Sequence, residues 1–449
     1  MKRAALLLAL ALGCAIVPRV TAQEVRDSIP GVTLGLVYET TYTPALAVRP
    51  FTARYGGESA ADQVEAIIAR DLRNSDRFQV MDSLPDAIST ESVDYRLWDR
   101  LGAVWLLTGQ VEGAGSGYTL ILQVHDVVYA RLKESGRFTV PNPESPDFRM
   151  AVHHASDEIV RWVFGEPGMA ASRVAFTMPA PGSTNKELYI VDSDGENLQR
   201  ITNHQSTILS PAWSPDGSRI AFTSYQTGFP RIYIRDLATG RERMIEPLRN
   251  GDQITPAWAP DGHTLAFGVT SGDRTGIYSY DVDKNCCLTQ LAGGRWNDFS
   301  PVYSPDGKEL LFNSNRLGTT VPQIYMMPAG GGDADLVSPY SYDRPGYFTS
   351  PDWSPLGDMV AFHGAIRPGT YHILVARVED KGRHVRQLTW EGNNEDPSWA
   401  PDGRHLVFKG ERRWGRGLFV VDAATGATRA VLSGINVTVP AWSPNLGGR

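Results

Sequence analysis

The octapeptide SPAWSPDG at residues 210–217 decides the fold, because it returns five more times in the second half of the chain. The other copies are TPAWAPDG from Thr255, SPVYSPDG from Ser300, SPDWSPLG from Ser350, DPSWAPDG from Asp396 and VPAWSPNLG from Val439. Their aromatic residues lie 43 to 50 residues apart, which is the period of four-stranded propeller blades. The repeat therefore predicts six blades.

Each copy has the pattern of a short strand, a tight turn and a second strand. Pro presets φ for the turn, Asp bonds the nearby backbone, and Gly accepts the positive φ that closes a hairpin. Turn chemistry thus explains the repeated acids better than catalysis does, and the repeated aromatics indicate packing between blades rather than a ligand cage. These acids are Asp216, Asp261, Asp306 and Asp402.

The two ends of the repeat region complement each other. Residues 173–177 form a second-strand sequence without a turn motif before it, whereas residues 439–445 supply a first strand and turn. Pairing these two segments would close the ring and remove its exposed sheet edges. We therefore expect an all-β six-bladed propeller over residues 172–449.

The segment before the ring predicts a mixed α/β domain over residues 46–164, joined to the ring by a linker at 165–171. Strand-like runs occur at 46–48, 103–107 and 118–128, and helices are expected near 93–101 and at 148–164. A capping box at residues 59–62 predicts the start of a further helix.

The predicted helix at 148–164 carries His153, His154, Asp157 and Glu158. This order differs from the H-E-x-x-H of zinc sites. We therefore interpret these residues as a packed or solvated helix face, and we predict no metal and no cofactor.

Residues 1–22 have the pattern of a secretory signal: Lys2 and Arg3, an apolar run, and a small residue at Ala22. We expect cleavage near Ala22 and export, with lipidation of Cys14 as an alternative. No later stretch is long and apolar enough to span a membrane.

The exported chain would keep Cys286 and Cys287, whose Cα atoms lie about 3.8 Å apart across a trans peptide, closer than an ordinary disulfide requires. We expect two neighbouring strand residues on opposite faces. A vicinal redox pair is the alternative.

Composition excludes one large class of function. With 43 Lys and Arg against 50 Asp and Glu, the formal net charge is -7, which disfavours a broad nucleic-acid-binding surface.

Four stretches outside the repeat, together with its six copies, make the chain resemble the TolB family of the Tol-Pal system. They are residues 48–51 (VRPF), 71–75 (DLRNS), 108–111 (TGQV) and 155–158 (ASDE). The resemblance implies a monomeric periplasmic adaptor without catalysis. It also implies binding of a peptidoglycan-associated lipoprotein, Pal, through the propeller mouth, and support of outer-membrane integrity and constriction at division.

The resemblance places the Pal-facing candidates just before the repeat motifs. They are Asp252, Gln253, Ile254, Thr255, Asn297, Asp298, Phe299 and Ser300, with Tyr347, Phe348, Asn394 and Glu395 completing the rim. Reversing the charge of Asp252 and Asp298 is expected to weaken Pal capture while leaving thermal unfolding nearly unchanged.

The resemblance also implies that the tail at residues 23–45 binds a TolA-like inner-membrane protein through Glu24-Val25-Arg26. Residues 32–38 read as a strand, which suits addition to a partner's sheet edge. A strand of the chain's own first domain is an equal alternative for this segment.

Other functions remain open at this point. One is a sugar- or peptide-binding propeller outside Tol-Pal. A propeller hydrolase would need G-x-S-x-G, which the sequence does not contain, and a lyase would need clustered histidines. The histidines of the repeat region are scattered without a common blade position: His204, His263, His363, His372, His384 and His405.

Overall fold

The computed structural model describes residues 42–82, 92–246, 251–318, 321–340, 346–367 and 369–447. The predicted signal with Cys14, and the tail with Glu24, Val25, Arg26 and the strand-like run 32–38, lie outside the described residues. Where the chain is described, none of its helices has both the length and the apolar character needed to cross a membrane.

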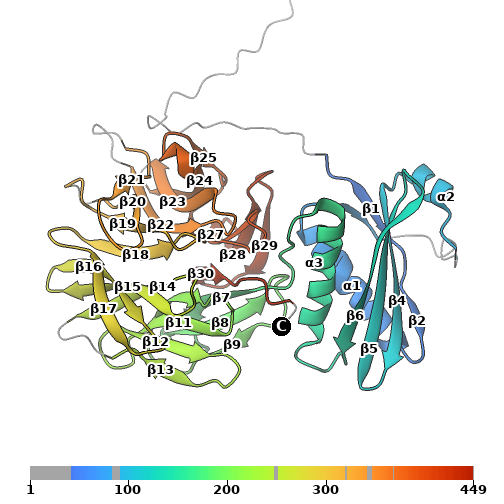
Figure 1. Cartoon of the computed structure of the whole chain (residues 1–449), viewed down its shortest axis with the longest axis horizontal. Helices are drawn as coiled ribbons and strands as arrows, with labels where there is room; N and C mark the ends of the chain where they lie inside the picture. The colour runs from blue at the N-terminus through green and yellow to red at the C-terminus, as the bar shows by residue number, and fades with distance from the viewer. Residues whose placement is uncertain are drawn as a thin grey trace, which may run out of the picture.

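The N-terminal unit is a sheet of six strands covered by helices (Figure 1). The strand order is β3-β1-β4-β5-β6, and β2 pairs with β4 beside β1. The strands are β1 Ala45–Val48, β2 Thr52–Arg54, β3 Gln79–Met81, β4 Trp105–Ala114, β5 Gly117–Asp126 and β6 Arg131–Pro141. The predicted strands 46–48, 103–107 and 118–128 correspond to β1, β4 and β5.

Two long helices, α1 (Glu58–Asn74) and α3 (Phe148–Phe164), pack their apolar residues on one face of this sheet. Val64, Ile68 and Ile159 are completely buried there, which explains the helical spacing of these residues in the sequence. The short helix α2 (Tyr95–Arg100) buries Trp98 in a separate small cluster. The bounds of α3 agree with the predicted helix.

The predicted capping box at residues 59–62 is wrong. Helix α1 begins one residue earlier, at Glu58, and the Ser59 hydroxyl contacts the Tyr118 hydroxyl at 3.0 Å. The chain enters this helix through Gly57, where a Cβ atom would lie 2.2 Å from the Val111 carbonyl oxygen. Close approach to β4 therefore sets the start of the helix.

The second unit is a closed ring of six four-stranded blades, which confirms the predicted fold class. The first blade contains β10 Ile208–Trp213, β11 Arg219–Ser224, β12 Arg231–Asp236 and β13 Glu242–Met244. The second contains β14 Asp252–Trp258, β15 Thr264–Ser271, β16 Arg274–Asp281 and β17 Cys286–Ala292. The third contains β18 Asp298–Tyr303, β19 Glu309–Ser314, β20 Gln323–Pro328 and β21 Asp335–Leu336.

The remaining blades follow the same plan. The fourth contains β22 Tyr347–Trp353, β23 Met359–Arg367, β24 Thr370–Arg377 and β25 Val385–Gln387, with a 3-10 turn, η2, at Val378–Asp380. The fifth contains β26 Asn394–Trp399, β27 His405–Arg412, β28 Gly415–Asp422 and β29 Thr428–Ser433. The closing blade joins β30 Thr438–Trp442 to β7 Arg173–Pro179, β8 Lys186–Asp192 and β9 Gln199–Arg200.

Closure joins the two ends of the ring as predicted. Strand β30 pairs antiparallel with β7, with Ala441 opposite Ala175 and Trp442 opposite Val174. The Trp442 indole nitrogen donates to the Ser172 hydroxyl at 2.7 Å. Because the last strand lies beside the first, the ring has no open seam between the closing blade and β10, which contacts β30.

Each innermost strand carries a β-bulge at the start of its repeat motif. The first motif residue has a left-handed backbone in all six copies, with φ between +47° and +55°: Ser210, Thr255, Ser300, Ser350, Asp396 and Val439. The register with the second strand shifts at this point in every blade. The bulges bend the strands around the central axis.

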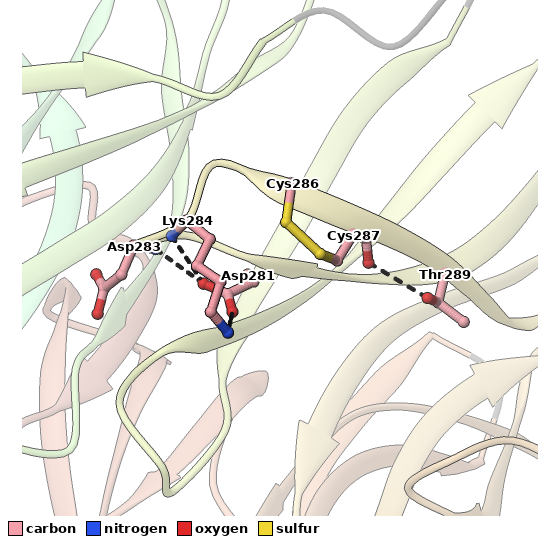
Figure 2. Close-up of a disulfide and its surroundings, with 6 residues drawn as sticks. All are labelled: Asp281, Asp283, Lys284, Cys286, Cys287 and Thr289. Carbon is pink, nitrogen blue, oxygen red and sulfur yellow. Dashed lines mark hydrogen bonds and ion pairs between the residues drawn. A yellow bond between two sulfur atoms is a disulfide. The ribbon is translucent and has the colours of Figure 1, made fainter.

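The expectation for Cys286 and Cys287 is wrong, because the two residues form a disulfide (Figure 2). An extended strand would direct the two side chains to opposite faces. Cys287 instead has φ +69°, and this left-handed backbone lets the neighbouring sulfur atoms meet.

Candidate functional site

A channel of about 630 Å³ runs through the ring and is lined by the six repeat motifs. The innermost strands begin at one end of the channel, which we call the mouth face. The Asp-Gly turns lie at the other end, which we call the turn face. Every innermost strand contacts the next, so residues at the start of these strands surround one opening.

The N-terminal unit attaches to the turn face. Nε2 of His405, just after the turn of the fifth blade, lies 3.2 Å from an Asp76 carboxylate oxygen. Asn445, in the turn after β30, donates to the Asp157 carboxylate at 2.8 Å. Helix α3 therefore stands beside the C-terminal end of the chain (Figure 1), and the mouth face lies at the opposite end of the same strands.

Four of the twelve predicted mouth residues are completely buried and serve the loops of the ring. The Gln253 amide bonds Ile232 N and Glu246 O, and the Asn394 amide donates to Glu391 O. Asp298 accepts a hydrogen bond from Arg316 at 3.1 Å, and Phe348 packs edge-on against Phe362. These buried side chains stabilise the loops that form the mouth.

The other eight predicted residues are partly exposed: Asp252, Ile254, Thr255, Asn297, Phe299, Ser300, Tyr347 and Glu395. Thr255 and Ser300 line the top of the channel, where Thr255 Oγ1 accepts a hydrogen bond from Ser300 N at 3.1 Å. Asp252 lies 3.5 Å from Arg231 with its side chain 42% exposed. The structure thus brings the predicted residues to one opening. Four of them support it from the interior, and eight are accessible to a partner.

The rim of the mouth has two chemically different halves. Leu209, Ile254 and Phe299 occupy the last position before the repeat motif in the first three blades, and we call them the apolar half. Thr349, Glu395 and Thr438 hold the same position in the other three, and we call them the polar half. Leu209 and Thr438 were not predicted, although their place before the motif could have revealed them.

Charged groups flank the polar half. Lys409 lies 3.1 Å from Glu395, and Lys186 donates to Thr438 Oγ1 at 3.2 Å. Burial lowers the pKa of Lys186, and the neighbouring Lys409 lowers it further. Burial also lowers the pKa of His363, whose Nδ1 accepts a hydrogen bond from Asp396 N at 3.0 Å.

At the third position of the repeat motif, the wall of the channel carries an acid in the fourth blade, where the other blades have small or apolar residues. Asp352 lies in the motif of the fourth blade and accepts a hydrogen bond from Trp399 N at 2.7 Å. Burial raises the pKa of Asp352 to about 6, against the hydrogen bonds from Trp399 and Ser398. This carboxyl group links two neighbouring blades.

The junction between the two units holds the histidines and acids that could be mistaken for metal sites. Within the described ranges, two groups bring three ligand atoms within 4.8 Å of one another: Asp71, His153 and Asp194; and Asp76, His405 and Asp422. Arginines already engage both groups, since Arg149 pairs with Asp194 and Arg404 with Asp422. The positive charge of the guanidinium groups opposes cation binding, so these groups act as ion-paired contacts.

The helix face around His153 is packed, as predicted. His153 Nδ1 lies 2.8 Å from an Asp71 oxygen that also accepts from Ser156 Oγ at 2.7 Å. Asp157 accepts hydrogen bonds from Ala170 N and Ala171 N in the linker. Burial raises the pKa of Asp157 to about 7, against these hydrogen bonds and that of Asn445, which lower it.

Two family models match the two units. The TolB amino-terminal domain matches residues 37–133, and the TolB β-propeller domain matches residues 161–446, more than half of the chain. The chain belongs to the TolB family. This confirms the resemblance seen in the sequence.

Known TolB proteins resemble the chain over different lengths. The Tol-Pal system protein TolB of Methylococcus capsulatus is 35% identical over 44% of this chain and 47% of its own length. That of Bordetella pertussis is 28% identical over 84% of both chains. The chain thus spans about half the length of the Methylococcus capsulatus protein. The crystal structure of TolB from Acinetobacter baumannii matches with a TM-score of 0.77 and 26% identity, over 90% of this chain and 97% of that one.

Proposed function

We propose that the chain is a non-enzymatic adaptor of a Tol-Pal envelope system, which binds the periplasmic domain of a Pal-like lipoprotein at the mouth face. The position of the mouth carries this proposal. Its accessible residues gather at the end of the channel opposite the junction, so a partner can dock without displacing the N-terminal unit.

The chemistry of the rim supports a protein partner. Apolar side chains at the centre of an interface supply most of the binding energy, and the partly exposed Ile254 and Phe299 directly precede the channel-lining Thr255 and Ser300. Lys186, Lys409 and Glu395 offer charged groups across the opening, which fix the orientation of a partner. The closed ring keeps both halves of the rim in fixed positions, so little conformational entropy is lost on binding.

The family and the cysteine chemistry support a periplasmic setting. Disulfides persist in oxidising compartments such as the bacterial periplasm, and Cys286 and Cys287 are joined. Together with the signal-like residues 1–22, this supports export to the periplasm. There the chain would support outer-membrane integrity and constriction, and its tail, through Glu24-Val25-Arg26, would bind a TolA-like protein.

Capture on an immobilised Pal-like domain tests the proposal. Ile254→Asp places a charge in the apolar half and is expected to weaken capture about tenfold or more, since buried anchors contribute more than about 1 kcal/mol each. Glu379→Arg is the matched control, because this exposed acid lies in η2, at the turn-face end of the fourth blade. Equal capture by both variants and the parent would contradict the proposal.

The charge reversal expected from the sequence suits Asp252 but not Asp298. Asp298 is completely buried against Arg316, and leaving that guanidinium unpaired costs about 3 to 5 kcal/mol. A loss of capture in an Asp298 variant would therefore report unfolding. Asp252→Lys remains a clean probe, because Asp252 is exposed at the rim.

Two other functions become outcomes of the same assay. Capture of a sugar or a peptide without any Pal-like protein would favour a binding propeller outside Tol-Pal. Turnover of a substrate, lost in a His363 variant, would favour a lyase.

A further inference from the structure

The Cys286–Cys287 disulfide lies at the first residues of β17, the outer edge strand of the second blade (Figure 2). Cys286 is partly exposed and Cys287 is exposed, so a small thiol reagent can reach the bond. Neighbouring blades do not bury this strand end, since residues 287–290 are all exposed. The bond is therefore an accessible chemical group and not a core staple.

The disulfide coincides with an irregular register between β16 and β17. Ser279 pairs with Thr289, whereas Asp281 pairs with Cys286, so β17 holds one extra residue in this interval. The extra residue forms a bulge at Cys287, whose φ is +69°. Non-glycine residues rarely adopt this backbone, and the bond to Cys286 adds a covalent constraint to it.

Hydrogen bonds hold both ends of β17. At the start, Arg243 of the first blade donates to Asn285 Oδ1 at 3.1 Å, and Asp281 accepts a hydrogen bond from Lys284 N at 2.9 Å. At the end, residues 293–296 lead into Asn297 at the mouth face, whose Oδ1 accepts a hydrogen bond from Thr275 N at 3.0 Å and whose N donates to Asn315 Oδ1 at 2.8 Å. A change of register in β17 therefore acts on the hydrogen bonds of Asn297 at the mouth.

We propose that Cys286 and Cys287 form a thiol–disulfide switch, acted on by a dithiol, that sets the register of β17 and the position of residues 293–297 at the mouth. A thiolate of the dithiol attacks one cysteine sulfur, the S–S bond breaks, and a mixed disulfide forms. The second thiolate then releases that cysteine. The chain gains two electrons and two protons, and the dithiol becomes a disulfide.

Reduction frees Cys287 from its left-handed backbone. A shift by one residue moves a strand about 3.3 Å and turns its side chains to the opposite face. The shift is local, because β17 is an edge strand that pairs with β16 alone in its sheet. Its effect on partner binding rests on the proposed function of the mouth, whereas the switch itself does not.

Mapping of a single tryptic peptide tests the bond. Cleavage after Lys284 and Arg295 yields residues 285–295, which contain both cysteines. In chain purified without reductant, we expect this peptide to resist alkylation, and to gain two alkyl groups after treatment with dithiothreitol. Double alkylation without reductant would overturn the proposal.

Amide hydrogen exchange of the full chain tests the register. Reduction is expected to speed exchange over residues 286–297 roughly tenfold and to leave β29, the cysteine-free outer strand of the fifth blade, unchanged. The double variant Cys286→Ser, Cys287→Ser should behave as the reduced chain. The variant Cys286→Ser, Cys287→Gly should keep the oxidised pattern, because glycine adopts positive φ without a bond. Unchanged exchange on reduction would overturn the switch.

Capture by a Pal-like domain separates the switch from the proposed function. Different capture by the oxidised and reduced chains would support control of the mouth, and equal capture would overturn it. Absence of capture in both states would count against the proposed function, and the exchange data would then decide the switch alone.

Discussion

The blade interfaces of the ring and the junction between the two units are held by different kinds of contact. Between the blades, one phenylalanine of each second strand is completely buried: Phe176, Phe222, Phe267, Phe312, Phe362 and Phe408. Tryptophan indoles add bonds across blades, as from Trp213 to Ala441 O at 3.0 Å and from Trp258 to Ala212 O at 3.2 Å. The junction instead joins charged groups, including Arg70 to Asp194 and His405 to Asp76.

This difference indicates which part of the molecule responds to solution conditions. Apolar burial depends little on pH or salt, whereas ion pairs depend on protonation and are screened by salt. The ring should therefore stay intact under conditions that loosen the junction. Three measurements test this difference between the ring and the junction.

The largest effect is expected inside the ring. Phe176→Ala removes a buried side chain beside the closing strand and should lower the free energy of unfolding by about 3 to 5 kcal/mol. Denaturant unfolding measures this loss. Phe229→Ala is the control, because Phe229 is 61% exposed and should change stability by less than about 0.5 kcal/mol. Similar losses in both variants would refute the packing argument.

A smaller effect is expected from pH at the junction. Burial alone would lower the pKa of His405, but Asp402, Asp76 and Asp422 raise it to about 9, above its ordinary value of 6.5. A raised pKa means that the protonated histidine stabilises the folded chain below pH 6.5, and that this contribution disappears as the pH rises through 9. Unfolding free energy should fall by roughly 2 to 4 kcal/mol over this interval.

Unfolding of the parent and of His405→Gln at several pH values checks this expectation. The variant should be less stable at pH 6.5 and should lose most of the slope up to pH 9, because it carries no titrating group at this position. A parent whose stability is flat from pH 6.5 to 9 would show that His405 does not hold its proton in the folded chain.

The smallest effect is expected at the edge of the junction. Arg70 is 42% exposed and pairs with Asp194 and Glu196, so Arg70→Ala should cost about 0 to 1 kcal/mol. The loss should shrink in 1 M salt, where the screening length falls to about 3 Å. Unfolding at low and high salt measures it, with Arg413→Ala, an exposed arginine of the fifth blade outside the junction, as the control. A loss that does not change with salt would argue against an ionic contact.

The sequence predicts the parts of the fold that repeat or have a regular period. Six motifs of fixed turn chemistry define the blades, and residues 173–177 and 439–445 are complementary halves of one blade. Helix α3 follows from its apolar spacing. Strand β6 was missed, because most of its residues are exposed and its sequence is polar.

The junction and the detail of the mouth could not be predicted in the same way. His153 and Asp71 are 82 residues apart in sequence, and only the tertiary fold brings them together. At the mouth, successive strand residues alternate between rim and interior, which explains why Gln253 is buried while Asp252 and Ile254 are not. The bond between Cys286 and Cys287 depends on a positive φ that ordinary strand geometry does not suggest.

The claim that the mouth face receives the partner is tested most directly by hydrogen exchange of the full chain with and without a Pal-like domain. Protection is expected at the starts of β14, β18, β22 and β26, around Ile254, Phe299, Tyr347 and Glu395. The Asp-Gly turns at the other end of the channel should exchange at the same rate in both samples. Protection of those turns, with unchanged exchange at the mouth, would contradict the account.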